Sequence, residues 1–429
     1  MKLQLSQPAR IFLALMFGLG AGIASGAVGG AWVGRARAIV EPIGGMWLNA
    51  LQMTIVPLIV SLLITGIAAS AQAARASRLA MHALILFVVL LWTSSIMAAF
   101  LTPLILSGFP VPAEAGKALR DGLPGAERVP DAPGLGEFLR SIVPDNPIEA
   151  ASESAILPLI VFVVVFAFAM IRLPEEPRKT LTGVFQAIAD TMLVVIGWVL
   201  WIGPIGVFAL AYGVGAGAGA TAFGALVHYV VIVMAVGSVM WLAAWPLAWL
   251  GARVSPLRFT RAVGPSQALA CSTQSSLACL PAMMRANAKL GVPVKASGLT
   301  LPMAVAIFRA TGPAMNLAVA IYVAHLMDVP LTPMTMAFGV AAAAVTTMGA
   351  AGIPGQASFF ASITPICLAM GVPIAPLGLF LAIEPIPDLM RTMGNVGMDV
   401  AATTVISKRS GFEEGEANSE EDRLLMEKV

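Results

Sequence analysis

The chain has 429 residues, of which 58% are hydrophobic and only 11% are charged. Soluble domains carry about 25% charged residues, so this composition excludes a water-soluble fold and predicts an all-α polytopic membrane protein. The formal net charge of +2 provides no basic surface for nucleic acid, and the three cysteines form no CxxC pair that would indicate a disulfide or metal site.

Apolar stretches of about 20 residues follow one another through the N-terminal part of the chain, and each is long enough to cross a bilayer as a helix. The first begins at Ile11 and has no small-residue cleavage site, so we expect a retained span and not a removed signal peptide. The six stretches lie at 11–33, 47–70, 79–106, 154–171, 184–213 and 223–250.

Lysine and arginine gather in alternate loops, which favours a cytoplasmic N-terminus because cytoplasmic loops carry an excess of basic residues. The C-terminus is cytoplasmic in the same orientation. The segment 107–153 is rich in proline, glycine and charge and is typical of an external loop. Residues after Gly411 form an acidic tail, for which we expect no regular structure.

Two later segments have apolar legs that are too short to be simple spans. Between Arg261 and Arg285 the polar run 272–276 leaves legs of about ten residues, and neither leg can cross roughly 30 Å of hydrocarbon. A helical hairpin that enters and leaves on one side fits this pattern. The segment 333–373 repeats the pattern from the other side around the tip 349–355, so the sequence predicts two opposed hairpins in an inverted repeat.

Between the hairpins, the stretch 297–327 is long enough to span but contains the run Phe308-Arg309-Ala310-Thr311-Gly312-Pro313. Glycine and proline weaken a helix there, and transporters use such interruptions to expose backbone groups to ions and anions. Arg309 lies about 20 Å along the helix from either polar end, which is too deep for its side chain to reach water by snorkelling.

Six polar residues lie within roughly a 100° arc of the last predicted helix. Charges inside a membrane span cost about 2.5 to 3.5 kcal/mol each and indicate a functional site by default. This stripe is therefore the predicted substrate site, and its members are Glu384, Asp388, Arg391, Thr392, Asn395 and Asp399.

The order of these elements and several motifs together resemble the dicarboxylate/amino acid:cation symporter family, which includes the glutamate and neutral amino acid transporters. The resemblance covers nearly the whole chain. It is carried by Met53-x-x-Val-Pro57-Leu, Val143-Pro-Asp-Asn-Pro147, Gly203-Pro-Ile-Gly-Val-Phe208, the serine-rich first tip before Leu280-Pro281, the Gly-Ile-Pro-Gly second tip, and Asp388-x-x-Arg391-Thr-x-x-Asn395-x-x-x-Asp399.

The resemblance implies an elevator-type glutamate transporter fold with eight transmembrane helices and two re-entrant hairpins, assembled as a homotrimer in the cell (inner) membrane. A transport domain would move against a rigid scaffold, with the second hairpin as its gate. The implied parts are 1–78 (scaffold helices one and two), 79–106 (transport-domain helix three), 107–153 (external loop), 154–215 (scaffold helices four and five), 223–407 (transport domain) and 408–429 (cytoplasmic tail). Within 223–407, helix six is followed by hairpin one at 258–290, the broken helix seven at 297–327, hairpin two at 333–373 and helix eight at 376–407.

The resemblance also implies roles for the stripe. Arg391 would pair with a side-chain carboxylate of the substrate, and Asp388 would take its α-amino group. The joint presence of these two residues favours an acidic amino acid, aspartate or glutamate, over a plain dicarboxylate. Asp399 and Asn395 would contribute to a sodium site, the only cofactor-like ion implied. The remaining implied substrate contacts are Ser275, Ser276, Gly352, Pro354, Gly355, Thr392 and Asn395.

The chain departs from the family most strongly in the broken helix. Where relatives carry Asn-Met-Asp-Gly-Thr, this sequence has Phe308-Arg309-Ala310-Thr311-Gly312, so an aspartate that ligates sodium is replaced by Ala310. One acid lost and one base gained make the fixed charge of the site more positive by two. We therefore expect Arg309 to act as a built-in cation that reduces or alters sodium coupling.

Three alternatives stay open at this point. The protein could be a C4-dicarboxylate carrier that is proton-coupled or cation-independent, with Glu384 as a candidate proton site. The buried charges could instead pair with one another, Arg309 with Asp388 or Asp399 and Arg391 with Glu384. An anion-conducting, channel-like or nonfunctional homologue is the third alternative. An enzyme is not predicted, because no Ser-His pair, paired aspartates or histidine cluster is visible.

Overall fold

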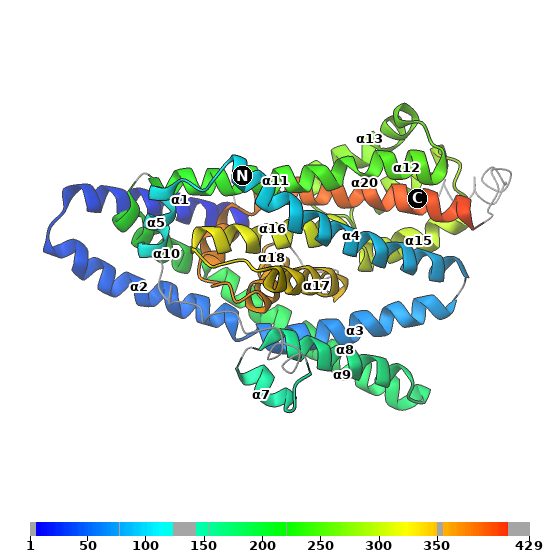
Figure 1. Ribbon diagram of the computed structural model, residues 1–429, viewed down its shortest axis with the longest axis horizontal. Helices are drawn as coiled ribbons and strands as arrows, with labels where there is room; N and C mark the ends of the chain where they lie inside the picture. Colours follow the sequence, from blue (N-terminus) through cyan, green and yellow to red (C-terminus); the bar gives the residue numbers. More distant parts are fainter. Residues whose placement is uncertain are drawn as a thin grey trace, which may run out of the picture.

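Every regular element in the described part of the chain is an α-helix, as the composition predicts. The connection between α1 (Gln7–Val28) and α2 (Ala31–Gln52) lies at one end of the elongated molecule, and the C-terminal end of α20 (Pro385–Arg409) lies at the other (Figure 1). The computed structural model describes residues 6–76, 78–122, 143–153, 155–219, 221–349 and 355–410.

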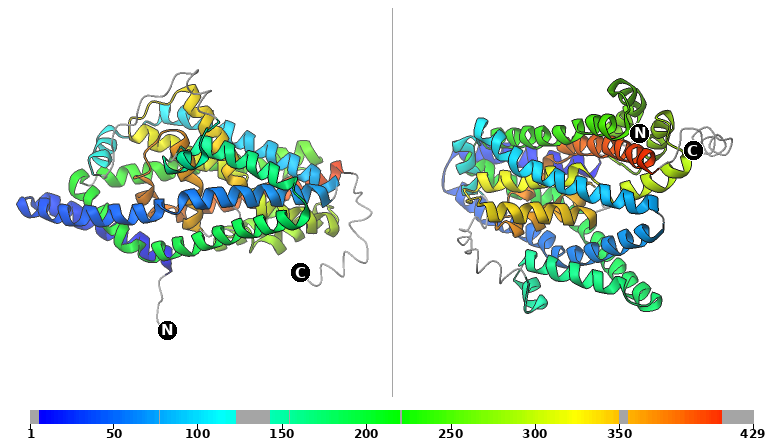
Figure 2. Two further views of the ribbon diagram at one scale, coloured as in Figure 1. Left: turned by 90° about the horizontal axis from the view of Figure 1, so that it is seen from below. Right: turned by 45° about the vertical axis from the view of Figure 1, so that its right-hand side comes forward.

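Among the described residues, six helical segments are long and apolar enough to cross a membrane, and they run largely along the long axis of the molecule (Figure 2). The predicted stretches 79–106 and 223–250 correspond closely to two of them. The six segments are Gln7–Val28, Ala31–Gln72, Arg78–Gly108, Glu175–Trp201, Phe223–Ala252 and Val294–Leu326.

Three predicted stretches are divided differently in the structure. The stretch 47–70 crosses the junction between α2, which ends at Gln52, and α3 (Ile55–Ala76). The first helix ends at Val28, short of residue 33, because Gly29 and Gly30 adopt positive φ angles of 66° and 103° that end the helix. The stretch 184–213 is split into α9 (Glu175–Trp201) and α10 (Gly203–Ala218). Pro204 stands at the start of α10, where its missing N–H does not interrupt a helical hydrogen bond.

Glycines allow α1 and α10 to pack with their backbones in close contact. A Cβ atom at Gly18 would lie 2.6 Å from the Phe208 carbonyl oxygen, and one at Gly22 would lie 2.8 Å from the Ala216 amide nitrogen. Gly18 and Gly22 are four residues apart, the small-xxx-small spacing that brings membrane helices together. This pair of helices forms one side of the molecule together with α2.

Replacing Gly22 with valine is expected to destabilise the protein by about 1 to 3 kcal/mol or more, because the new side chain would overlap the α10 backbone, which cannot move aside locally. Gly20 lies on the same helix, but a Cβ atom added there would meet nothing within 4 Å, so Gly20→Val is the matched control. Thermal unfolding in detergent measures both variants. Equal loss of stability in the two would contradict close packing at Gly22.

A second group of helices packs around α3 (Ile55–Ala76), which contacts both α8 (Ile156–Ile171) and α9. The predicted external segment contributes two short helices, α5 (Ala113–Gly122) and α7 (Pro147–Ser152). The Asn146 side chain begins α7 by accepting a hydrogen bond from the Ile148 amide at 3.0 Å.

The C-terminal half of the chain contains two pairs of helices and one broken helix. Helices α13 and α14 pack together around a tip at 274–279, where Gln274 adopts a left-handed conformation with φ 51°. Helices α17 and α18 form the second pair, and α15 is separated from α16 at 308–310, inside the predicted interruption. The bounds are α13 (Pro256–Thr273), α14 (Leu280–Lys289), α15 (Val294–Ile307), α16 (Thr311–Leu326), α17 (Pro333–Gly349) and α18 (Gly355–Ala369).

The core of the molecule lies around α16 and α20. Every residue of α16 except His325 is buried, and α16 packs against α4 (Arg78–Gly108), α11 (Thr221–Leu242), α17 and α20. Helix α20 follows α19 (Leu377–Ile383) and contacts α11, α12 (Ala244–Ala252), α13 and α15. The polar stripe of α20 is therefore enclosed by protein on several sides.

Candidate functional site

The site is built at the start of α20, where Pro385 and Pro387 follow the end of α19. Glu384 occupies the N-cap position, and its carbonyl accepts a hydrogen bond from the Asp388 amide at 3.0 Å. Prolines are tolerated in this first turn because its amides have no helical partner. All six members of the predicted stripe are buried, so a charge here needs a partner.

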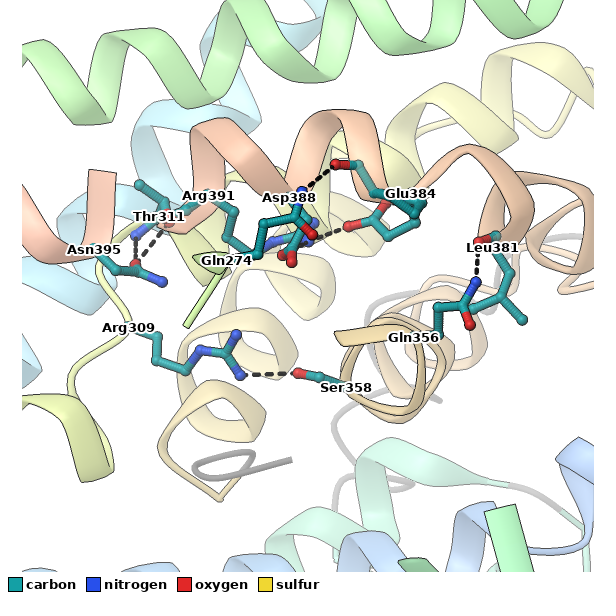
Figure 3. A network of polar contacts seen from close by, with 11 residues as sticks. Gln274, Arg309, Thr311, Gln356, Ser358, Leu381, Glu384, Asp388, Arg391 and Asn395 are labelled. Carbon is teal, nitrogen blue, oxygen red and sulfur yellow. Dashed lines mark hydrogen bonds and ion pairs between the residues drawn. The ribbon is translucent and has the colours of Figure 1, made fainter. Parts of the chain in front are cut away.

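Arg391 holds two carboxylates at once (Figure 3). Its Nη1 donates a hydrogen bond to Asp388 Oδ1 at 3.0 Å and another to Glu384 Oε1. Arg391 Nε and Nη2 have no hydrogen-bond partner among the described residues. These two nitrogens lie along one edge of a guanidinium, the geometry that binds a carboxylate through two parallel hydrogen bonds.

Arg309 approaches the same region from the break between α15 and α16. Its Nη1 donates a 2.9 Å hydrogen bond to Ser358 Oγ on α18 (Figure 3). Arg309 is half-buried, and its charge lies within electrostatic range of Asp388 and Asp399. Of the pairings left open by the sequence, the structure contains Arg391 with Glu384, and it directs Arg309 to a serine on the second helix pair.

Asn395 joins the broken helix to α20. Its Oδ1 accepts hydrogen bonds from the Thr311 amide at 3.0 Å and from the Thr311 hydroxyl at 2.7 Å. The Thr311 hydroxyl also lies 2.9 Å from the Arg391 carbonyl. The carboxamide oxygen that was assigned to substrate or sodium is thus engaged in positioning the start of α16.

Asp399 is fully buried, and neither of its carboxylate oxygens has a hydrogen-bond partner in the described ranges. Arg309 is the cation whose charge acts on it. A buried carboxylate with two unpaired oxygens is costly unless a positive charge or a cation stabilises it. Both Asp399 and Asn395 stay predicted cation ligands; the oxygens of Asp399 have no hydrogen-bond partner among the described residues, whereas Asn395 Oδ1 already accepts two hydrogen bonds from Thr311.

A small cavity lies between α16, α17, α18 and α20. Its volume of about 10 Å³ matches one water molecule, so a substrate enters only after side chains or a hairpin move. Arg309, Asp388 and Arg391 are the predicted residues that reach it. The described lining is Arg309, Gly312, Asn316, Thr347, Ser358, Phe359, Ser362, Asp388 and Arg391.

The other predicted contacts that the structure describes do not line this cavity. Ser275 and Ser276 are half-buried in the first tip, which is tied to the start of α20 by a 2.9 Å hydrogen bond from Gln274 Nε2 to the Pro385 carbonyl. Thr392 is buried on α20 but does not line the cavity. Gly355 begins α18, while Gly352 and Pro354 lie outside the described residues.

Sequence reasoning missed the polar residues that the second helix pair and α16 contribute. Ser358 and Ser362 are four residues apart on α18 and therefore share one face, and Asn316 and Thr347 come from α16 and α17. The signal that could have found them was this pair of serines at helical spacing within an otherwise apolar leg.

The chain is similar in sequence to several known transporters. The chain is 27% identical to the proton/glutamate-aspartate symporter of Escherichia coli, over 86% of this chain and 85% of that protein. It is 29% identical to neutral amino acid transporter B(0) of Bos taurus, over 90% and 77% respectively. It is 25% identical to C4-dicarboxylate transport protein 2 of Ralstonia nicotianae, over 93% and 88%.

The relatives are membrane transporters of small acidic or neutral molecules, and none is named as an enzyme. The model of the sodium:dicarboxylate symporter family matches residues 8–409, which include all the helices from α1 to α20 almost completely. The predicted resemblance is thus confirmed: the chain is a multi-pass membrane transporter that belongs to the sodium:dicarboxylate symporter family.

Proposed function

We propose that the protein is a secondary active symporter that carries an acidic amino acid, aspartate or glutamate, across the membrane. The observation that carries this proposal is that two guanidinium groups and one carboxylate line a single cavity. An acidic amino acid carries the complementary set, two carboxylates and one ammonium. Each pairing is a charge-assisted hydrogen bond, which is stronger than a neutral one.

The atoms of each group match this assignment. Arg391 offers Nε and Nη2 to one carboxylate, while Glu384 and Asp388 hold its Nη1. Arg309 offers the second carboxylate a cation from the opposite side of the cavity. Asp388 uses Oδ1 to accept from Arg391, and its other oxygen is the group that would receive the ammonium.

Asp388→Asn is expected to weaken aspartate binding by about 10- to 100-fold and to leave succinate binding within about threefold, because a buried charged hydrogen bond contributes roughly 1.5 to 3 kcal/mol. Asparagine keeps the oxygen that accepts from Arg391. Calorimetry with aspartate, glutamate, succinate and malate measures the effect. Asp190→Asn, an exposed carboxylate on α9, is the matched control.

A C4-dicarboxylate is the second candidate substrate. It is favoured by the 3.0 Å hydrogen bond that already joins Asp388 to Arg391, because a carboxylate satisfied in this way does not require an ammonium partner. Succinate and malate would then bind the unsubstituted protein at least as tightly as aspartate. With that result, a C4-dicarboxylate would replace the acidic amino acid as the proposed substrate.

We further propose the elevator mechanism of the family for this chain. Two features support it: the break before α16 and the pair α17–α18 contribute residues to the cavity, as transporter hairpins and broken helices do, and the tip of the pair α13–α14 is tied to the start of α20. The proposal includes eight transmembrane helices with two re-entrant hairpins, the scaffold and transport parts assigned from the sequence, a homotrimer in the inner membrane, and cytoplasmic termini.

The proposed coupling differs from that of a symporter that uses several sodium ions. Arg309 brings a permanent positive charge to the side of the cavity where Ala310 has replaced an acidic residue. Asp399 remains able to bind a transported cation, and Arg309 already supplies part of its charge compensation. Transport with fewer sodium ions per substrate, or with none, follows from this arrangement.

A further inference from the structure

The middle of the chain carries an unbalanced positive charge. No aspartate or glutamate occurs between Asp190 and Asp328, whereas this stretch contains seven lysines and arginines. One of them, Arg309, belongs to the cavity described above. The other six lie at the end of α12, along α13 and α14, and at the start of α15: Arg253, Arg258, Arg261, Arg285, Lys289 and Lys295.

Three of these cations line a groove of about 350 Å³ at the base of the α13–α14 pair. Arg258 donates a 3.2 Å hydrogen bond from Nη2 to the Lys289 carbonyl, which holds the two helices together at this point. In the described part of the chain, no carboxylate forms an ion pair with the lining cations. The groove is lined by Ser255, Leu257, Arg258, Arg261, Ala262 and Lys289.

The start of α13 adds to the positive potential. Ser255 is its N-cap and accepts a hydrogen bond from the Arg258 amide at 3.4 Å, and Pro256 follows at the first helical position. The free amides of a helix start carry a partial positive charge that favours a nearby anion. The groove therefore combines three side-chain charges with a helix end, all of the same sign.

Helix α20 packs beside α12 and α13, and the groove lies at the start of α13 (Figure 1). A Cβ atom at Gly251 would lie 2.6 Å from Val405 Cγ2, so the end of α12 packs against the last turns of α20. Two short chain segments lead away from this contact. The groove residue Ser255 lies four residues after Gly251, and Ser410, where the described part of the chain ends, lies five residues after Val405. At about 3.5 Å per extended residue and 1.5 Å per helical residue, the chain that leaves Ser410 needs fewer than ten residues to reach the groove.

That chain is strongly acidic. Residues 411–429 contain seven of the 23 acidic residues of the protein and only two basic ones, Arg423 and Lys428. Its formal charge is thus −5, opposite in sign to the groove. Six of the seven acidic side chains lie within the first twelve residues, the part that reaches the groove: Glu413, Glu414, Glu416, Glu420, Glu421 and Asp422.

We propose that the acidic segment 411–422 docks on the cationic groove formed by Arg258, Arg261 and Lys289 at the base of the α13–α14 pair. Tethering raises the local concentration of the segment to the millimolar range, which lets several weak ion pairs act together. Exposed ion pairs contribute about 0 to 1 kcal/mol each and are screened by salt, so the docked state is sensitive to ionic strength.

Photo-crosslinking of the full chain in phosphatidylcholine nanodiscs tests this contact. A photoreactive amino acid replaces Leu257, which lines the groove and is 61% exposed. We expect crosslinks to peptides from 411–422 at 50 mM salt and at least fivefold fewer at 1 M salt. Neutralising the six acidic residues with glutamine and asparagine is expected to have the same effect as high salt. If the crosslink yield stays the same at 1 M salt and after neutralisation of the six acidic residues, the proposal is overturned.

A charge exchange separates electrostatic docking from accidental proximity. Reversal of Arg258, Arg261 and Lys289 to glutamate is expected to abolish the crosslinks, and a further reversal of the segment to lysine is expected to restore them. Arg172→Glu, an exposed cation at the C-terminal end of α8, is the control and is expected to change nothing. Failure of the exchange to restore the crosslinks would count against docking.

Changing the lipid composition tests whether anionic lipid headgroups, and not the segment 411–422, occupy the groove. In phosphatidylglycerol nanodiscs, anionic headgroups compete for the same cations, and we expect the crosslinks to persist at no less than half their level in phosphatidylcholine. Their complete replacement by lipid adducts would assign the groove to anionic lipid headgroups and would overturn docking of the segment.

Discussion

Arg391→Gln is expected to lower the affinity for the acidic substrate by at least about 30-fold, because removing one partner of a buried hydrogen-bonded charge pair costs roughly 2 to 5 kcal/mol. The substitution removes the Nε and Nη2 edge, which has no hydrogen-bond partner among the described residues, and glutamine cannot replace two parallel hydrogen bonds. Calorimetric titration with aspartate measures the loss.

The same substitution would also leave Glu384 and Asp388 without their shared partner, so lost folding must be separated from lost binding. Breaking a buried ion pair destabilises a protein by about 3 to 5 kcal/mol, whereas removing both charges is close to neutral. The double variant Glu384→Gln/Arg391→Gln removes one of the two unpaired carboxylates, so it is expected to regain part of the thermal stability without regaining substrate affinity. Binding by this double variant would contradict the role given to Arg391.

Much of the fold followed from hydrophobic length and from helix-breaking residues. The stretch 79–106 was predictable because uninterrupted apolar residues of that length form a spanning helix, and 308–310 was predictable because Gly312 and Pro313 weaken helix continuity. The division between α9 and α10 was missed, because apolar residues continue through Ile202 and hydropathy does not register a one-residue break in a helix.

The site was only partly predictable for a related reason. Helical spacing placed Asp388 and Arg391 on one face of α20, and the structure joins them directly. The contact between Arg309 and Ser358 joins positions 49 residues apart, so no local pattern could reveal it. Asn395 was on the correct face, yet its partner is the Thr311 backbone and hydroxyl, which depends on how α16 packs against α20.

The largest functional change is expected when the charge pattern of the broken helix is reversed. In the unsubstituted protein, Arg309 supplies a positive charge to the cavity lining, so replacing sodium with choline is expected to change aspartate affinity by less than about threefold. The double variant Arg309→Met/Ala310→Asp removes one positive charge and adds one negative charge at the cavity. Two charges about 4 Å apart interact by roughly 4 kcal/mol at a local dielectric constant of 20, so the variant needs an external cation to bind an anionic substrate.

We therefore expect 100 mM sodium to raise the aspartate affinity of that double variant by more than about tenfold, equivalent to 1.4 kcal/mol. Arg309→Lys retains the positive charge but not the planar guanidinium, and it is expected to remain insensitive to sodium. Uptake into proteoliposomes with and without a sodium gradient tests the same distinction during transport. A strong sodium requirement in the unsubstituted protein, unchanged by either substitution, would show that Arg309 does not replace the ion. If the lysine variant acquired the sodium requirement, hydrogen bonding to Ser358 would matter more than charge, because only the guanidinium geometry differs between the two side chains.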